Sequence, residues 1–100
     1  MALRRLDFPT QEIRKLCRQY RVRELALFGS ALRDDFTDAS DIDLLVEFEP
    51  EARVSFITLT RMQRELATLL HHRVDLVPKR GLKPRIRQAV LDSAEVIYAT

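Results

Sequence analysis

The chain has 100 residues, of which 46% are hydrophobic and 32% are charged. These fractions are typical of one globular domain over residues 1–100, and they exclude a disordered chain, which combines low hydrophobicity with high net charge. The net charge of +2 implies no strong electrostatic footprint for nucleic acid.

The first half of the chain predicts two long strands and one long helix. The helix follows the candidate N-cap Thr10, because apolar residues recur at helical spacing: Ile13, Leu16, Cys17 and Tyr20. A strand over residues 21–28 ends at Gly29. Residues 30–33 have the length of one helical turn, residues 34–40 are mostly polar and predict a loop, and residues 41–48 predict a central strand.

The second half adds two helices and two strands. Ser55 is the candidate N-cap of a long helix with four core-facing residues, Leu59, Met62, Leu66 and Leu69. Residues 73–77 predict a short strand closed by Pro78. Pro84 suits the first turn of another helix, with a stripe of Ile86, Ala89 and Val90, and residues 96–98 predict a last strand. This alternation predicts an α/β sheet covered by helices.

Two acidic residues share one face of the central strand. Asp41 and Asp43 stand at i and i+2, so both carboxylates leave the same side, with Cα atoms roughly 7 Å apart. Ile42, Leu44 and Val46 point the other way and can bury. Carboxylates on a mostly apolar strand need a compensating positive charge, and hard oxygen ligands at this spacing suit Mg²⁺. The alternative is that both acids only face solvent at the strand edge.

A third acid lies in the short strand over residues 73–77. Asp75 faces away from Val74 and Leu76, so it can join Asp41 and Asp43 if its strand neighbours residues 41–48. Three carboxylates around one site could hold two metal ions for an in-line displacement at phosphorus. A single exposed acid in a short strand is the ordinary alternative.

Gly29 and Ser30 stand where a strand ends and a helical turn is expected to begin. Gly29 lets the backbone approach a phosphate closely, and the N–H groups of a helix start, with the Ser30 hydroxyl, bind anions. Arg33 lies one turn further, where it either contacts phosphate or pairs with a nearby surface acid. A turn glycine followed by an N-cap serine is the structural alternative.

These residues together resemble a known signature. Gly29-Ser30, then ten residues, then Asp41-x-Asp43 is similar to the pattern of the DNA polymerase β nucleotidyltransferase superfamily, and the short chain resembles its minimal nucleotidyltransferase branch. Asp75 matches the place of the third acid in that family. The resemblance covers nearly the whole chain and implies a polymerase β-like nucleotidyltransferase fold, a small mixed β-sheet flanked by helices.

The resemblance implies roles for six residues in nucleotidyl transfer. Gly29, Ser30 and Arg33 would hold the triphosphate of an NTP, with ATP the expected substrate. Asp41 and Asp43 would bridge two Mg²⁺ ions, and Asp75 would complete the metal site on the side of the nucleophile. An acceptor hydroxyl would attack the α-phosphorus and pyrophosphate would leave.

The same resemblance implies a partner. Many minimal nucleotidyltransferases are antitoxins encoded beside HEPN-domain toxins, and some transfer AMP to a tyrosine of that toxin. We therefore expect an antitoxin that adenylylates a HEPN-type toxin. Two alternatives stay open, a non-catalytic antitoxin that acts by binding alone and a nucleotidyltransferase that modifies a small molecule.

Other features bear on the setting. Cys17 is the single cysteine, which excludes an intramolecular disulfide and a multi-cysteine zinc site. No apolar run approaches the roughly 20 residues of a membrane helix, and no apolar stretch follows the arginines of Met1–Leu6, so we expect a cytoplasmic protein without a signal peptide or membrane partner. The basic residues over 79–87 lack interleaved aromatics, so no specific nucleic-acid partner is expected. Because 100 residues cannot enclose an acceptor as well as a nucleotide, we expect a homo-oligomer or a hetero-complex.

Overall fold

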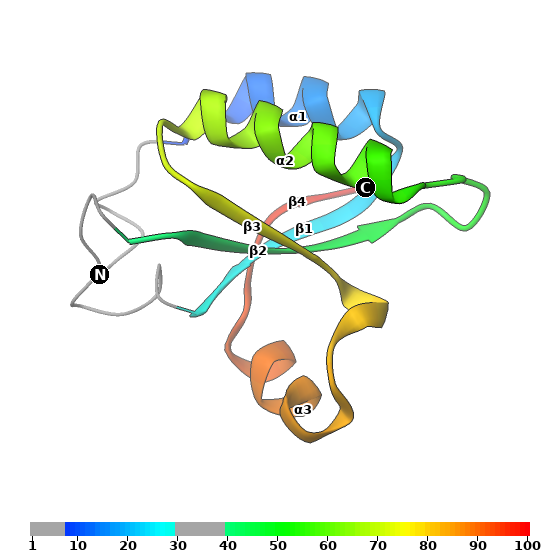
Figure 1. Ribbon diagram of the computed structural model, residues 1–100, viewed down its shortest axis with the longest axis vertical. Coiled ribbons are helices and arrows are strands. Elements are labelled where there is room, and N and C mark those ends of the chain that lie inside the picture. The colour runs from blue at the N-terminus through cyan, green and yellow to red at the C-terminus, as the bar shows by residue number, and fades with distance from the viewer. Residues whose placement is uncertain (1–7, 30–39) are drawn as a thin grey trace.

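A four-stranded sheet organises the computed structural model, which describes residues 8–29 and 40–100 (Figure 1). Its order is β3-β2-β1-β4, with strands β1 (Val22–Phe28), β2 (Ile42–Phe48), β3 (Val74–Pro78) and β4 (Glu95–Ala99). β2 runs antiparallel to β1 and parallel to β3, and β4 runs antiparallel to β1. The sheet is therefore mixed, which confirms the expected fold class and makes the two acidic strands neighbours.

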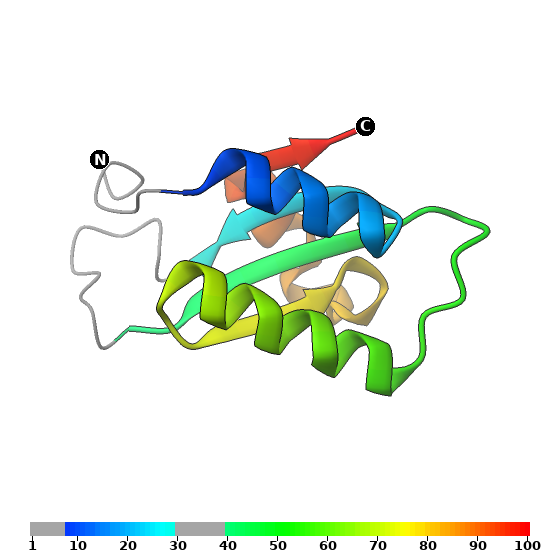
Figure 2. The ribbon, with the colours of Figure 1, turned by 90° about the horizontal axis from the view of Figure 1, so that it is seen from above.

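The helices cover the two faces of this sheet unequally. α1 (Thr10–Gln19) and α2 (Phe56–Leu70) lie side by side on one face, and α3 (Pro84–Ser93) lies on the other (Figures 1 and 2). A 3₁₀ turn, Lys79–Gly81, links β3 to the segment before α3. Among the helices of residues 8–29 and 40–100, none is long and apolar enough to cross a membrane.

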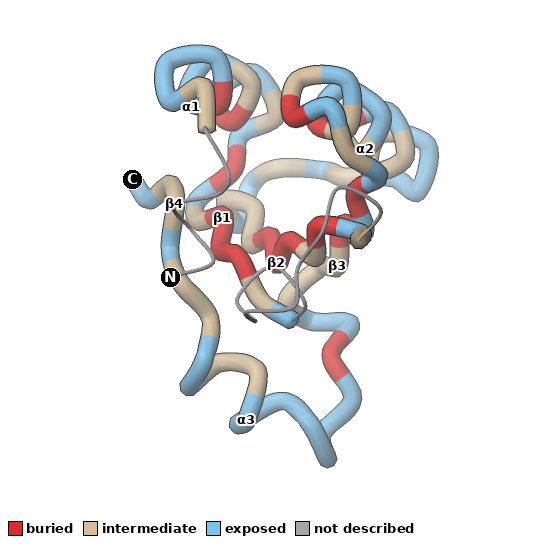
Figure 3. Tube along the Cα trace, turned by 90° about the vertical axis from the view of Figure 1, so that its left-hand side faces the viewer, coloured by how far each residue is buried: buried red, intermediate tan, exposed pale blue. Residues whose placement is uncertain are grey.

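The main core lies between the sheet and the pair of helices α1 and α2. Both helices and the strands beneath them carry buried segments, drawn in red in Figure 3. The buried residues of this core include Ile13, Cys17, Leu25, Leu27, Ile42, Leu44, Val46, Met62 and Leu66. The predicted inward positions of β2 are confirmed. Because side chains alternate along a strand, Asp43 and Asp75 must face the opposite side.

α3 packs on the sheet along only part of its apolar stripe. Val90, together with Leu91 and Ala94, packs on a small second core around Ala26 and Leu45. Ile86, Ala89 and Val90 all lie in this helix, as the stripe predicts, but Ile86 remains 50% exposed. The reason is geometric, because the helix touches this face near its C-terminal end. The α3 face of the sheet is consequently only partly covered.

The helix ends follow local rules, with one correction. Ser55 is the N-cap of α2, as expected, since its Oγ accepts a hydrogen bond from Thr58 N at 3.1 Å. Pro84 opens α3 as predicted. Thr10, however, is the first residue of α1 and Pro9 is its N-cap, because Ile13 N already donates to Pro9 O at 3.0 Å. The turn expected over residues 30–33 lies outside the described residues.

Candidate active site

Asp43 and Asp75 occupy paired positions on the parallel strands β2 and β3. The register aligns Ile42 with Val74 and Asp43 with Asp75, so both carboxylates leave the face that α3 only partly covers. Asp43 is half-buried and Asp75 is exposed, whereas Val74 is buried on the helix-covered face. The structure thus brings two of the three predicted acids side by side.

Asp41 lies one step further towards the N-terminal edge of these strands, opposite Arg73. Ile42 N donates a hydrogen bond to Arg73 O at 2.8 Å, which extends the parallel pairing beyond the first residues of the two strands. The side chains also meet, because Arg73 Nε lies 3.0 Å from Asp41 Oδ1. The result is a two-by-two array, with Asp41 and Asp43 along one strand and Arg73 and Asp75 along the next.

Gly29 completes the described part of this edge. It follows β1 directly, and the antiparallel register places its neighbour Phe28 opposite Asp43. Its φ is 70°, in the left-handed region, and a Cβ on this residue would lie 3.2 Å from Asp43 Cγ and overlap the carboxylate oxygen. Gly29 and Asp43, the second acid of the predicted motif, therefore meet in space. Ser30 and Arg33 lie outside the described residues, so their predicted phosphate contacts remain predictions.

The donor chemistry of this edge suits a hard divalent cation. Carboxylates are ligands that Mg²⁺ accepts, and Mg²⁺ is commonly held by one or two of them together with water and substrate phosphates. In residues 8–29 and 40–100, no group of three or more His, Cys, Asp or Glu side chains lies close enough together to hold a metal ion. Asp41, Asp43 and Asp75 share one face of the sheet but do not form such a group in the described residues. That they bind metal together remains a prediction.

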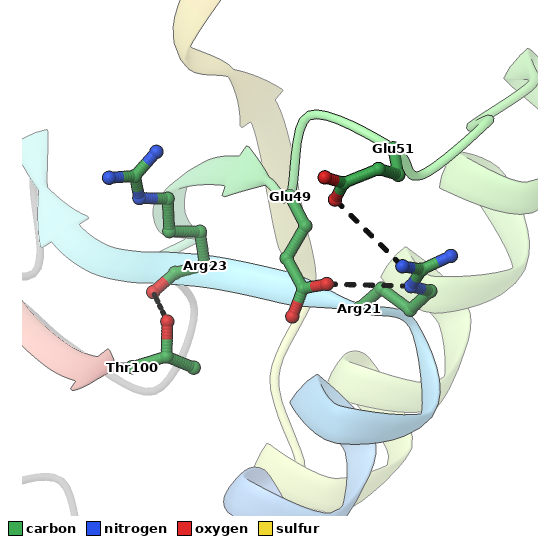
Figure 4. A network of polar contacts seen from close by, with 5 residues as sticks. All are labelled: Arg21, Arg23, Glu49, Glu51 and Thr100. Carbon is green, nitrogen blue, oxygen red and sulfur yellow. Dashed lines mark hydrogen bonds and ion pairs between the residues drawn. The ribbon is translucent and has the colours of Figure 1, made fainter.

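The opposite end of β1 and β2 is held by surface contacts. Arg21 Nε lies 3.4 Å from Glu49 Oε2, and the Arg21 Nη2 atom lies 4.0 Å from Glu51 Oε2, while the Thr100 hydroxyl donates to Arg23 O at 3.5 Å (Figure 4). A groove of about 580 Å³ also opens at this end, with Phe56 and Arg80 among its lining residues. Asp41, Asp43 and Asp75 do not line this groove, so these features belong to a different part of the surface.

Arg73 is the residue of this edge that the sequence interpretation missed. Its signal was present, because Arg73 stands two residues before Asp75 and must share its face if the strand extends that far. The role of Arg73 depends on its contact with Asp41, and that contact follows from the pairing of β2 with β3.

Comparisons with known proteins identify the family of the chain. Residues 11–97 match the family described as nucleotidyltransferase domain. A protein adenylyltransferase MntA of Thermococcus cleftensis is 38% identical over 89 residues, which are 89% of this chain and 86% of that protein.

Solved structures show the same arrangement of elements. A toxin–antitoxin crystal structure with AMP-PNP superimposes with a TM-score of 0.74 at 26% identity, over 93% of this chain and 75% of the other. The complex of a tri-AMPylated Shewanella oneidensis HEPN toxin with its MNT antitoxin gives a TM-score of 0.66 at 27% identity, over 91% of this chain and 70% of the other. The expected polymerase β-like nucleotidyltransferase fold is confirmed.

Proposed function

Because the chain belongs to the nucleotidyltransferase-domain family and is a nucleotidyltransferase similar to protein adenylyltransferases, we propose that it transfers AMP from ATP to a protein hydroxyl. The observation that supports this most directly is the meeting of Gly29, Asp43 and Asp75 at one edge of the sheet. These residues come from three separate segments, and their closeness supports the roles that we propose for them. A solvent-facing acid at a strand edge would require no such meeting.

Some residues of this edge would bind the metal ions, and others would bind the triphosphate. Asp41 and Asp43 would hold two Mg²⁺ ions, with Asp75 beside them, and Gly29, Ser30 and Arg33 would bind the triphosphate. Bound Mg²⁺ would lower the pKa of the acceptor hydroxyl and offset charge on the departing pyrophosphate. In the transfer, the acceptor oxygen would bond to the α-phosphorus, the bond from that phosphorus to the pyrophosphate oxygen would break, and the hydroxyl would release its proton to water.

The acceptor that we propose is a tyrosine of a HEPN-type toxin. One structural relative is the MNT antitoxin bound to a tri-AMPylated HEPN toxin, which supports a partner of this class for the present chain. The small fold also favours a partner-supplied acceptor, because the α3 side of the sheet leaves the acids Asp41 and Asp75 exposed. The chain would then act in the cytoplasm as an antitoxin that modifies its toxin.

A mass measurement on the complex tests this proposal. The chain is incubated with its HEPN-type partner, ATP and Mg²⁺, and the intact mass of the partner is followed. We expect a gain of one or more AMP groups, loss of the gain in chelator, and loss of it with Asp43→Asn. A partner that is neutralised without any gain in mass would instead make the chain an antitoxin that acts by binding alone.

A second measurement addresses assembly. We expect the active species to be a homo-oligomer or a hetero-complex in sedimentation experiments, because an acceptor surface must come from elsewhere. Full transfer activity by a strict monomer on a small hydroxylated acceptor would favour the small-molecule alternative.

A further inference from the structure

The array of charges at the edge of β2 and β3 contains an arginine whose role the motif does not explain. Arg73 contacts Asp41 through its Nε at 3.0 Å, and Asp41 is one of the carboxylates proposed to hold metal. The backbone brings the two residues opposite each other, since Ile42 N donates to Arg73 O. The same alternation that puts Asp75 on this face puts Arg73 there, so the guanidinium lies where divalent cations are expected to bind.

A guanidinium and a metal ion compete for a carboxylate in this position. Two unit charges about 4 Å apart interact by about 1 kcal/mol in water, and a divalent ion doubles this figure. Arg73 therefore stabilises the metal-free acids and opposes the entry of a cation beside Asp41. The Arg73 side chain is 80% exposed, so it can leave Asp41 without uncovering a buried surface.

The charge of the arginine is useful in the loaded state as well. The positive charge of two Mg²⁺ ions is about equal to the negative charge of one nucleoside triphosphate, so loading both leaves the net charge around the acids about unchanged. A guanidinium also presents paired N–H donors that match phosphate oxygens. A triphosphate bound beside these acids would give Arg73 a second anionic partner of the right shape.

We propose that Arg73 is an exchangeable counter-ion, which pairs with Asp41 in the empty protein and moves to the phosphates when metal and nucleotide bind. This inference rests on the proposed function, because it takes Asp41 and Asp43 as metal ligands. It assigns Arg73 opposite effects on the two ligands, since it weakens binding of the metal alone and strengthens binding of the metal–nucleotide complex.

Calorimetric titrations with Mn²⁺ as the probe test these opposite effects. Mn²⁺ alone, and Mn²⁺ with AMP-PNP, are titrated into the wild-type chain, Arg73→Gln, Arg73→Lys and the control Arg53→Gln. Arg53 is exposed and makes no ion pair among the described residues, and it lies beyond the far end of β2. Thermal melts confirm that each variant is folded.

We expect Arg73→Gln to bind Mn²⁺ alone about fivefold more tightly and Mn²⁺ with AMP-PNP about tenfold more weakly. Arg73→Lys keeps the positive charge but lacks the paired N–H donors of the guanidinium. Its affinity for Mn²⁺ alone should therefore stay near that of wild type, and its affinity for Mn²⁺ with AMP-PNP should lie between those of wild type and Arg73→Gln. Arg53→Gln matches wild type in both titrations. A change of the same sign for both ligands, or an unchanged affinity for Mn²⁺ alone, would overturn the exchange.

An Asp43→Asn titration separates this inference from the function beneath it. If Asp43→Asn binds Mn²⁺ as wild type does, the proposed carboxylate site fails and the Arg73 exchange fails with it. If Asp43→Asn loses Mn²⁺ while Arg73→Gln changes nothing, the proposed site stands and only the role of Arg73 is wrong.

Discussion

The Asp43 carboxylate occupies the space that a side chain at position 29 would need. A Cβ built on Gly29 would overlap Asp43 Oδ2 and lie 3.4 Å from Asp43 Cβ, and the φ of Gly29 is 70°. Two independent reasons therefore require glycine at position 29: the left-handed backbone conformation and the close approach of the Asp43 side chain. Gly29 and Asp43, which are the glycine and the second acid of the motif, are therefore packed directly against each other.

Gly29→Ala should destabilise the chain by about 2 kcal/mol. Roughly 1 kcal/mol comes from an alanine held in the left-handed region, and the rest comes from displacement of the Asp43 side chain. Urea unfolding measures the loss. Gly81→Ala is the matched control, because a Cβ there would meet only Pro78 Cδ at 3.9 Å, and it should cost less than about 0.5 kcal/mol. Equal losses in the two variants would show that position 29 has no special constraint.

Asp43→Asn should make the metal-free protein more stable and inactive at once. Asp43 pairs in register with Asp75, and removing one of two neighbouring negative charges relieves their repulsion, by roughly 1 kcal/mol. The neutral amide is a poor ligand for Mg²⁺, so transfer should be abolished. Thermal melts in EDTA and in Mg²⁺-ATP, beside an activity assay, measure both effects.

The control for this variant is an acid outside the array. Asp92 lies on α3 and accepts a hydrogen bond from Gln88 Nε2 at 2.7 Å, so Asp92→Asn should leave transfer intact and should not raise stability. If Asp43→Asn melts like wild type in EDTA and still transfers nucleotide, Asp41, Asp43 and Asp75 do not form a functional cluster.

Local patterns were enough to predict the faces of the sheet. In β2, the alternation of Ile42, Asp43 and Leu44 places the acid opposite the apolar residues, because each strand residue turns to the other side. The strand bounds also differ from the expected ones by only about one residue, since Gly29 and Pro50 interrupt regular structure in any context. The faces and the ends of the strands depend on residues that are close in sequence, so both can be predicted from the sequence alone.

Non-local relationships were harder to predict. The contact between Arg73 and Asp41 joins positions 32 residues apart, and it depends on the parallel register of β2 and β3 rather than on either segment. The extent to which α3 covers the sheet also depends on distant residues, because Val90, Leu91 and Ala94 pack around Ala26 and Leu45 while Ile86 stays 50% exposed. A helical stripe identifies an apolar side of a helix, but it does not identify how much of that side meets the sheet.

Cys17 should be unreactive in the folded chain. Its side chain is completely buried between α1 and the sheet, and burial raises the pKa of the thiol to about 12, so the reactive thiolate is scarce at neutral pH. Labelling with a thiol reagent in increasing urea should follow the global unfolding transition monitored by circular dichroism. Rapid labelling without denaturant would show that α1 detaches from the sheet on its own.

Tyr20, at the C-terminal end of α1, joins that helix to α2. Its hydroxyl donates a hydrogen bond to Glu65 Oε2. Burial, followed by this hydrogen bond and the charge of Glu65, raises the pKa of Tyr20 from 10.0 to about 12. The folded protein thus keeps a phenolic proton that the unfolded chain loses in this range. The contribution to stability is complete below about pH 10 and declines as the pH rises towards 12.

Tyr20→Phe should therefore cost about 1 kcal/mol at neutral pH, the usual value of a lost hydrogen bond, and the difference from wild type should shrink between about pH 10 and pH 12. Urea unfolding of both proteins across this range measures it, and other titrating groups cancel in the comparison. Tyr98→Phe leaves Tyr20 as the only tyrosine, so ultraviolet absorbance of that variant reports the Tyr20 phenol directly. A phenol midpoint near pH 10, or a stability difference that does not change with pH, would mean that Tyr20 and Glu65 do not hold α1 against α2.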